Sequence, residues 1–381
     1  MEVVLRNSLV EINRLRSEIM NDKNVSSLQE RVDQSEKMGL PSFHDFDDVE
    51  ILQWYLFKPE HLNREHDKSL RTIKEYQKEI TLFISHLLSF SYEIGLDIDD
   101  IKDNSLFKSL EKRHLRRYQE WLATKSPHVQ KKGKYSPATL SRKTIIIKNF
   151  FQYLFQIGYI KTPVHEGLLV ATVRKDDRPN RDLGPKEVKQ LLDYFNEHNH
   201  PIAFSIIHVL VTTGLRNEEF CKLKVKDVQY DSIHGNYYLK ITGKGNKRRD
   251  IPLREKTLNS IKMFREARGL PSIHESDKDS PLFVTNNKKP YSPSYLSQQL
   301  SKMIQRTKLP FLENCQVKIT PHVFRHSFSI ISHLSGVDIY DIMRSLGHEK
   351  IDTTMIYLEK IFEKEKHAIH GWKPEIFGEY I

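Results

Sequence analysis

The chain contains few of the residues that build disulfide or metal scaffolds. Only two of its 381 residues are cysteines, Cys221 and Cys315, and neither lies in a CxxC pair or another metal-ligand spacing. We therefore expect neither a disulfide framework nor a structural zinc site. The sequence also lacks a run of 18 or more apolar residues and the basic-then-apolar N-terminus of a signal peptide. We expect a soluble, intracellular protein without a membrane partner.

Positive charge is what the chain has in excess. The formal net charge is +10 and the pI about 9.2. The first 50 residues hold six basic and 11 acidic side chains, a net charge of −5, so the other 331 residues carry +15. This basic balance indicates a polyanionic partner, either nucleic acid or an anionic membrane surface. A chain of this length is expected to form two or three domains.

The N-terminal half has the apolar periodicity of helices. An acidic helical extension is expected over residues 1–48, with an amphipathic helix at 3–20. Residues 49–170 predict a helical domain that includes helices within 69–88, 108–125 and 136–158. The last of these begins with Ser136 and Pro137, a good N-cap and first helical residue, and ends near Gly158.

The C-terminal half predicts a second domain over residues 183–381, after a charged linker at 171–182. It is mostly helical. Strands at 237–242 and 247–253 flank the turn GKGN and predict a hairpin. The fold class is therefore mainly α with a small antiparallel β-sheet.

Basic side chains cluster on the helices of the first domain and in the linker. Each basic residue taken singly is typical of a solvated charged face. Because several of them cluster on neighbouring helices, a phosphate-facing surface is an equally good explanation. The candidate DNA contacts are Arg113, Arg116, Arg117, Arg142, Lys143, Lys148, Arg174 and Lys175.

Four motifs in the second domain carry residues that suit a phosphodiester. They are TTGLRNEEF with Arg216 and Glu219, TGKGNKRRD with Lys244, TPHVFRHSF with His322 and Arg325, and LGHEKIDTTMIYLE with His348 and Tyr357. His322 and Arg325 are spaced i, i+3 and share one helical face. Tyr357 is expected on the first turn of a helix that follows the loop of His348.

Each of these residues also has an ordinary explanation as a salt bridge, a turn lysine, a helix cap or a packed aromatic. Together, two arginines, a lysine, two histidines and a late tyrosine can surround a phosphodiester with donors and supply an oxygen nucleophile.

This order of motifs resembles that of the tyrosine recombinases, the family of phage integrases, chromosome-dimer resolvases and transposon recombinases. The resemblance extends over roughly residues 65–360, because TIKEYQKEITLFISHL and SPATLSRKTIIIKNFFQYL are similar to the family's core-binding domain. The departure is the acidic N-terminal segment, where many integrases carry a basic arm-site binding domain.

The resemblance implies a role for each motif residue. Arg216 and Arg325 would hold the non-bridging phosphate oxygens, and His348 would donate to the same oxygens. Tyr357 would attack phosphorus and leave a 3′-phosphotyrosyl bond, with His322 as the base. Lys244 would protonate the leaving 5′ oxygen, and Glu219 would orient Arg216 or a histidine. No metal and no cofactor are expected.

The resemblance also implies a two-domain clamp around duplex DNA that carries a specific recombination site. In it the helical core DNA-binding domain and the catalytic domain close on the duplex. We expect a homotetramer on DNA and a monomer or dimer in its absence. The need for accessory proteins stays open, as does docking of the C-terminal tail on its own domain or on a neighbouring protomer. The expected location is the cytoplasm, on the nucleoid, for a protein encoded by a bacterium or a phage.

Two other functions stay open: a catalytically silent DNA-binding regulator with the same fold, and a type IB topoisomerase. The intact set of six residues argues against the regulator, and the two-domain layout favours the recombinase. The sequence does not give the target site, nor does it distinguish integration, excision and resolution.

Overall fold

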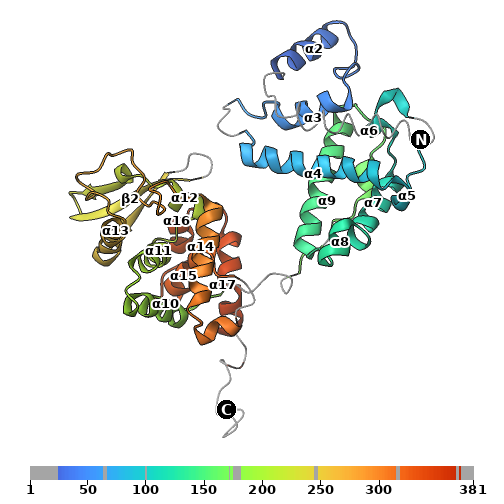
Figure 1. Cartoon of the computed structure of the whole chain (residues 1–381). Helices are drawn as coiled ribbons and strands as arrows, with labels where there is room; N and C mark the ends of the chain where they lie inside the picture. Colours follow the sequence, from blue (N-terminus) through green and yellow to red (C-terminus); the bar gives the residue numbers. More distant parts are fainter. Residues whose placement is uncertain are drawn as a thin grey trace. The chain divides into compact units, whose positions relative to one another are not determined.

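The chain forms two compact units, residues 1–178 and 179–381, each with its own apolar core (Figure 1). The computed structural model describes residues 25–62, 67–98, 101–170, 172–174, 182–243, 248–314, 318–365 and 369. The predicted helix at 3–20, Cys315 and the tail beyond residue 369 lie outside these ranges. The boundary between the units falls within the predicted linker. No helix in the described ranges is long and apolar enough to cross a membrane.

The first unit is helical. Its elements are α2 (Val25–Lys37), α3 (Asp48–Phe57), α4 (Leu70–Ser89), α5 (Ser91–Ile94), η3 (Lys102–Asn104), α6 (Leu106–Ser109), α7 (Lys112–Thr124), α8 (Pro127–Lys132), α9 (Pro137–Gln156) and η4 (Val164–Gly167). The 20-residue helices α4 and α9 pack against each other. Together with α7 they enclose a core that is rich in aromatic rings, including Phe83, Phe150 and Phe151.

The caps of these helices follow from the sequence. The Ser136 side chain accepts from the backbone N–H of Thr139, and Pro137 is the first residue of α9, as predicted. Gly158 has a φ of +74° just beyond the end of this helix, which also confirms the predicted stop. On α7, Leu115, Tyr118 and Leu122 are buried and form its inward face.

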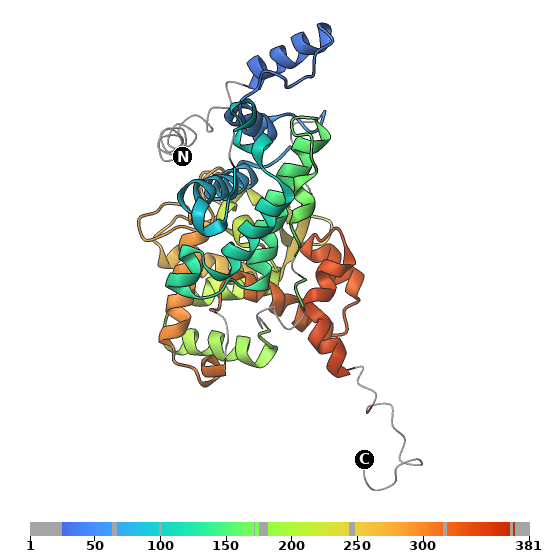
Figure 2. The ribbon, with the colours of Figure 1, turned by 90° about the vertical axis from the view of Figure 1, so that its right-hand side faces the viewer.

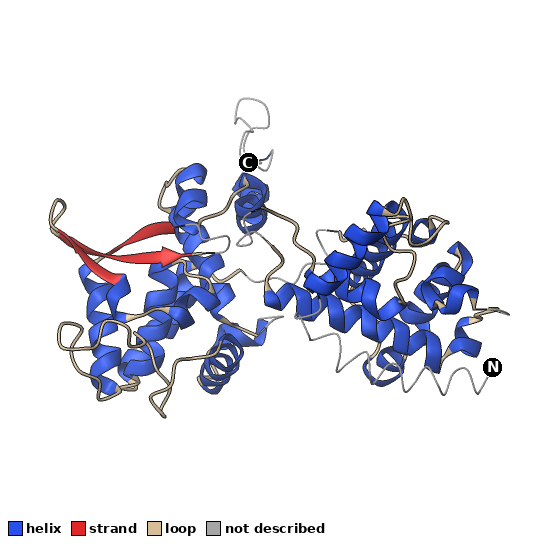
Figure 3. Ribbon diagram, turned by 90° about the horizontal axis from the view of Figure 1, so that it is seen from above, coloured by secondary structure: helices blue, strands red, loops and turns tan. Residues whose placement is uncertain are grey.

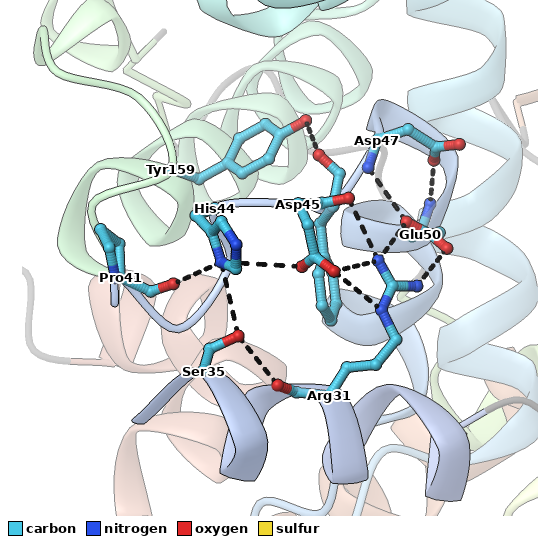
Figure 4. Close-up of polar contacts among 9 residues, drawn as sticks. Arg31, Ser35, Pro41, His44, Asp45, Asp47, Glu50 and Tyr159 are labelled. Atoms are coloured by element: carbon cyan, nitrogen blue, oxygen red, sulfur yellow. Dashed lines mark hydrogen bonds and ion pairs between the residues drawn. The ribbon is translucent and has the colours of Figure 1, made fainter. Parts of the chain in front are cut away.

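The acidic segment before residue 48 is in part a component of the first core. Leu28 and Val32 of α2 are buried in the same cluster as α3, so the structure differs from the predicted extension over 1–48. Arg31 donates to both carboxylate oxygens of Glu50, at 2.5 and 3.2 Å, and its Nε donates to Asp45 at 3.2 Å (Figure 4). The carboxylates of Asp45 and Glu50 therefore hold α2 against α3 through Arg31.

The second unit is a helical domain with one small sheet. Its elements are α10 (Pro185–Glu197), α11 (Pro201–Thr213), α12 (Asn217–Lys222), η6 (Val225–Asp227), β1 (Val228–Asp231), β2 (Asn236–Thr242), β3 (Arg248–Leu253), α13 (Glu255–Ala267), α14 (Pro293–Arg306), η8 (Pro310–Asn314), α15 (Pro321–Leu334), α16 (Ile339–Leu346) and α17 (Ile351–Glu365). The apolar helix α11 lies at the centre, packed against α10, α13 and α15.

The sheet is antiparallel with the order β1-β2-β3 and lies at one side of this unit (red in Figure 3). The predicted hairpin is confirmed: Thr242 pairs with Arg248 and Ile241 with Arg249. β1 was not predicted because its four residues, VQYD, are too few to show an alternating pattern. Leu239, Ile241 and Ile251 face the core.

Helices α15, α16 and α17 form a small apolar cluster of their own. Ile330 of α15, Ile342 and Leu346 of α16 and Leu358 of α17 are buried together. As a result α17 lies beside α15 and α16 (Figures 1 and 2). This packing brings the third and fourth sequence motifs to one place.

Candidate active site

The first motif forms the turn between α11 and α12. Gly214 ends α11 in the left-handed conformation, with a φ of +61°. A Cβ at this position would lie 2.9 Å from Cδ2 of Leu346, so the turn requires glycine on grounds of both space and φ. Arg216 follows as the N-cap residue of α12. The turn thus lies directly against the end of α16.

Arg325 of α15 is buried beneath this turn, with 1% of its surface exposed. It donates to the carbonyls of Gly214 and Leu346, both at 2.6 Å. Burial, followed by the charge of Arg216, lowers the pKa of Arg325 to about 10, while Tyr357 and Glu219 act in the opposite direction. The guanidinium therefore stays charged at neutral pH in a site of low polarity.

The two predicted arginines converge. Arg216 donates from Nη2 to the carbonyl of Gly347 at 3.0 Å, one residue after the Leu346 carbonyl that Arg325 binds. Gly347 is the left-handed C-cap of α16, with a φ of +64°. Both guanidinium groups thus lie at the C-terminal end of one helix, where exposed carbonyls attract positive charge.

His348 is the next residue and is 9% exposed. Its Nε2 lies 2.9 Å from Nη2 of Arg325, and its Nδ1 lies 2.9 Å from Oγ1 of the buried Thr354. Burial, then the charges of Arg325, Arg216, Arg249 and His322, lower the pKa of His348 to about 3. The imidazole is neutral at physiological pH.

Tyr357 lies on the second turn of α17, not on the first turn as expected, since that helix begins at Ile351. Its ring is surrounded by histidines. The ring centroids lie 3.8 Å from His326, 5.3 Å from His348 and 6.0 Å from His322. His322 and His326 also contact each other, with 3.2 Å between their Nε2 atoms.

Glu219 links Arg216 to a third arginine, Arg249 of β3. Its carboxylate accepts from the backbone N and Nη1 of Arg216, at 2.8 and 2.9 Å, and from both terminal nitrogens of Arg249, at 2.9 and 2.7 Å. Burial alone would raise the pKa of Glu219, but Arg249 and then Arg216 lower it to about 2. Glu219 thus binds Arg216 directly, and its predicted role in orienting that side chain stays a prediction.

Sequence reasoning missed Arg249, His326 and Thr354. Each had a signal. Arg249 occupies an inward position in the alternation of β3, in phase with Ile251 and Leu253. His326 comes one helical turn after His322, and Thr354 comes one turn before the tyrosine.

Of the six predicted catalytic residues, five meet at this site: Arg216, His322, Arg325, His348 and Tyr357. The sixth, Lys244, lies outside the described residues, in the segment 244–247 that joins β2 to β3. Among the described side chains no group of three or more His, Cys, Asp or Glu residues is arranged to hold a metal ion.

The candidate DNA-contacting residues of the first unit differ in their exposure and in the groups that they bind within the protein. Arg113 and Arg117 both pair with Asp97, at 3.3 and 3.2 Å, whereas Arg116 is exposed. On α9, Arg142 pairs with Glu75 and Lys143 with Glu79, and Lys148 donates to the carbonyl of Leu168 at 3.3 Å. Arg174 is exposed, and Lys175 lies outside the described residues.

The sequence of this chain is similar to those of known tyrosine recombinases. Residues 181–364 match the model of the phage integrase family. The tyrosine recombinase XerC of Chlorobaculum parvum is 28% identical over 261 residues, which cover 63% of this chain and 74% of that protein. A tyrosine recombinase of Thermosipho africanus is 28% identical over 304 residues, covering 78% of this chain and 91% of that protein.

Solved structures share the fold. The XerH site-specific recombinase bound to a palindromic difH substrate, in a post-cleavage complex, matches with a TM-score of 0.58 and 20% identity, over 80% of this chain and 81% of that chain. A lambda integrase dimer bound to a COC′ core site matches with a TM-score of 0.55 and 12% identity, over 86% of this chain and 85% of that chain. The mainly α fold with its small antiparallel sheet is the fold of these proteins.

Proposed function

We propose that the chain is a tyrosine recombinase of the phage integrase family, and that it recombines DNA at a specific site with Tyr357 as the nucleophile. The convergence at the end of α16 carries this proposal. Arg216 and Arg325 donate to consecutive carbonyls there, and His348, the residue that follows them, packs against the tyrosine ring. Residues of three distant motifs thus share one site.

The two arginines would hold the scissile phosphate. A phosphodiester is an anion, and attack at phosphorus adds negative charge to its non-bridging oxygens. Guanidinium groups bind such oxygens in a bidentate manner, which an ammonium group does not. The burial of Arg325 strengthens this attraction because the surroundings are less polar than water. Removal of one preorganised donor typically costs about 10²–10³ in rate.

The proposed cleavage step conserves atoms and charge. Oη of Tyr357 attacks phosphorus, its proton passes to His322, and the bond between phosphorus and the 5′ oxygen breaks. Lys244 gives a proton to the departing oxygen. The products are a 3′-phosphotyrosyl bond and a 5′-hydroxyl, and the reverse reaction with the 5′-hydroxyl of another strand rejoins the DNA. The energy of the original bond is kept in the covalent intermediate.

A pair of histidines supports the proton transfer from the tyrosine. A phenol has a pKa near 10, so it needs a base to become a good nucleophile. His322 is exposed beside the tyrosine ring, and its Nε2 contacts Nε2 of His326, whose ring lies tilted against that of the tyrosine. A proton taken by His322 can therefore be shared with His326.

The proposed partner is double-stranded DNA that carries a recombination site, which agrees with the formal net charge of +10. We propose that a homotetramer assembles on two such sites from monomers or dimers, on the nucleoid in the cytoplasm of a bacterium. Whether the outcome is integration, excision or resolution depends on how the two sites are arranged.

A covalent selection tests the nucleophile and finds the site. The protein is incubated with a library of nicked duplexes whose central positions are randomised, and the DNA joined covalently to protein is recovered and sequenced. We expect one enriched sequence, no adduct with Tyr357→Phe, and a normal adduct with Tyr340→Phe, which alters an exposed tyrosine of α16.

Two outcomes would contradict the proposal. The absence of any adduct in the wild type would indicate a silent DNA-binding regulator. Adducts without sequence preference, together with relaxation of any supercoiled plasmid, would indicate a topoisomerase.

A further inference from the structure

Residues 121–165 carry positive charge without a single negative side chain. This stretch of 45 residues holds eight lysines and arginines and no aspartate or glutamate. It runs from the last turn of α7 through α8 and α9. A basic group in this stretch can be neutralised only by an acidic group from elsewhere in the chain. The ion pairs therefore decide where positive charge remains available to a partner.

The basic side chains within α9 are engaged inside the first unit. Arg142 pairs with Glu75 and Lys143 with Glu79, both of α4. The Lys143 side chain is only 12% exposed. Lys148 donates to the carbonyl of Leu168 at 3.3 Å. These contacts hold α9 in the fold and reduce the charge that it presents to solvent.

The basic turn, residues 131–136, is different. It joins α8 to α9 and contains Lys131, Lys132 and Lys134, whose side chains are all exposed. None of the three forms an ion pair with any residue that the structure describes. Three uncompensated positive charges thus lie within four residues. Like charges at such short spacing repel one another, and an anionic partner relieves that repulsion.

The basic turn is ordered by contacts on both sides. The rings of His128 and Tyr135 stack, with 4.0 Å between their centroids and 7° between their planes. Tyr135 packs against the apolar core of the unit, and Nζ of Lys143 lies 5.4 Å from the centroid of its ring. Gly133 allows the reversal of the chain with a φ of +82°. The backbone that carries the lysines is therefore preorganised, which lowers the entropic cost of binding.

The start of α9 adds to the positive field of the basic turn. This 20-residue helix begins at Pro137, three residues after Lys134, and has no acidic side chain in its first turn. The N-terminus of a helix carries a partial positive charge, which an acidic residue in the first turn would offset. Here that partial charge lies beside the lysines, and both attract an anion.

We propose that the basic turn is a sequence-independent contact for the phosphate backbone of duplex DNA. The inference rests on the proposed function for the identity of the polyanion. Lysine side chains are flexible point charges, which attract phosphates without the planar geometry that reads base edges in pairs of hydrogen bonds. An anionic membrane fits less well, because none of residues 121–144 is an exposed large apolar side chain that could enter lipid.

The slope of log affinity against log salt measures this contact. The experiment uses the full chain with Tyr357→Phe, so that no covalent adduct forms, and a duplex of arbitrary sequence. The turn variant combines Lys131→Gln, Lys132→Gln and Lys134→Gln. It should reduce the slope by about two to three, because each neutralised phosphate releases about 0.9 counterions. Affinity at about 100 mM salt should fall by about 10²-fold.

A control variant with the same loss of charge tests whether the position matters. It combines Lys37→Gln, Lys102→Gln and Lys161→Gln, three other exposed lysines of the first unit. Its slope should change by less than about one, since solvent-exposed charges that do not contact DNA are screened beyond about 10 Å at this salt. On a duplex with the sequence found by the covalent selection, the turn variant should lose affinity by the same factor as on arbitrary DNA, as expected for contacts to phosphates.

Each other outcome counts against the proposal. Equal slopes for the two triple variants would reduce the effect to net charge. A larger loss on the selected sequence than on arbitrary DNA would indicate that the turn reads bases. A wild-type slope for the turn variant would remove the lysines from the DNA interface. If the variant then also failed to bind phosphatidylserine vesicles that the wild type binds, the turn would belong to a membrane surface.

Two further measurements keep the test decisive. If the turn variant does not fold, the single changes Lys131→Gln and Lys134→Gln must each lower the slope by about 0.9, and unchanged slopes would refute the contact. A wild-type protein that forms no adduct through Tyr357 would refute the proposed function, whereas the slopes do not depend on cleavage.

Discussion

Arg325 and His348 are hydrogen-bonded to each other, with 2.9 Å between Nη2 and Nε2. A guanidinium group only donates, so Nε2 of the histidine accepts and its proton lies on Nδ1. Nδ1 donates to Oγ1 of Thr354. Donation from Nε2 to a phosphate requires the other tautomer, and the threonine hydroxyl allows it because a hydroxyl can accept or donate.

Thr354→Val should therefore slow DNA cleavage although it preserves side-chain volume. It leaves Nδ1 without a partner, and an unsatisfied buried polar group costs about 1–3 kcal/mol, equivalent to a rate loss of about 5- to 150-fold if the cost falls on the transition state. The rate of adduct formation in a single turnover measures this loss. Thr354→Ser should retain the rate, and Thr353→Val, at the exposed neighbouring position, is the control. An unchanged rate for Thr354→Val would exclude the hydroxyl from this role.

His348 should make the fold sensitive to mild acid. Its pKa in the folded protein, about 3, is below its ordinary value of 6.5, so between these values the unfolded chain binds a proton that the folded protein does not. Stability is therefore lost as pH falls below 6.5, by up to about 1.4 kcal/mol per pH unit. His348→Gln should show a shallower fall in melting temperature between pH 7 and about pH 5. Parallel curves for the two proteins would contradict this assignment.

Glu219 affects stability at lower pH than His348 does, and it is charged in the folded protein where His348 is neutral. Its pKa is lowered from 4.5 to about 2, so it stabilises the fold above pH 4.5 and this contribution is lost as pH falls toward 2. The comparison above pH 5 avoids this second transition.

The contact between α2 and α3 should be measurable as stability of the first unit. Arg31 binds Glu50 and Asp45 and lies 4.7 Å from the centroid of the Phe46 ring (Figure 4). Because these groups are partly exposed, we expect Arg31→Met to cost about 1 kcal/mol. Urea unfolding of the full chain, followed by fluorescence, reports on Trp54 and Trp121, both buried in this unit. Lys37→Met, at the end of the same helix, should have no effect.

The ion pairs of the arginines on α7 predict which of these arginines contributes most to DNA binding. Arg116 is exposed, whereas Arg117 donates to Asp97 and to the carbonyl of Gly95. If both face DNA, Arg116→Gln should reduce the slope of log affinity against log salt by about one, because each neutralised phosphate releases about 0.9 counterions. Arg117→Gln should reduce it less. Affinity titrations from about 50 to 200 mM salt give both slopes, and equal slopes would show that Asp97 yields to DNA.

Local signals in the sequence predicted much of the fold. Ser136, Pro137 and Gly158 predicted the two ends of α9 because helix caps act over one helical turn. The GKGN turn predicted the β2–β3 pairing because the strands of a hairpin are close in sequence. β1 and the role of α2 were missed for the opposite reason. β1 exists through its pairing with β2, and α2 is held by burial of Leu28 and by the carboxylate of Glu50 from another helix.

The sequence by itself predicted the chemistry: Arg216, Arg325, His348 and Tyr357 suit a phosphodiester as a set, although each residue alone also has an ordinary explanation. Only the tertiary structure decided how they meet. Glycine turns at Gly214 and Gly347 and the apolar packing of α15, α16 and α17 bring distant segments together. Arg249, His326 and Thr354 were recognised from these contacts, because hydrogen bonds and ring stacking depend on distances in space that spacing along the chain does not specify.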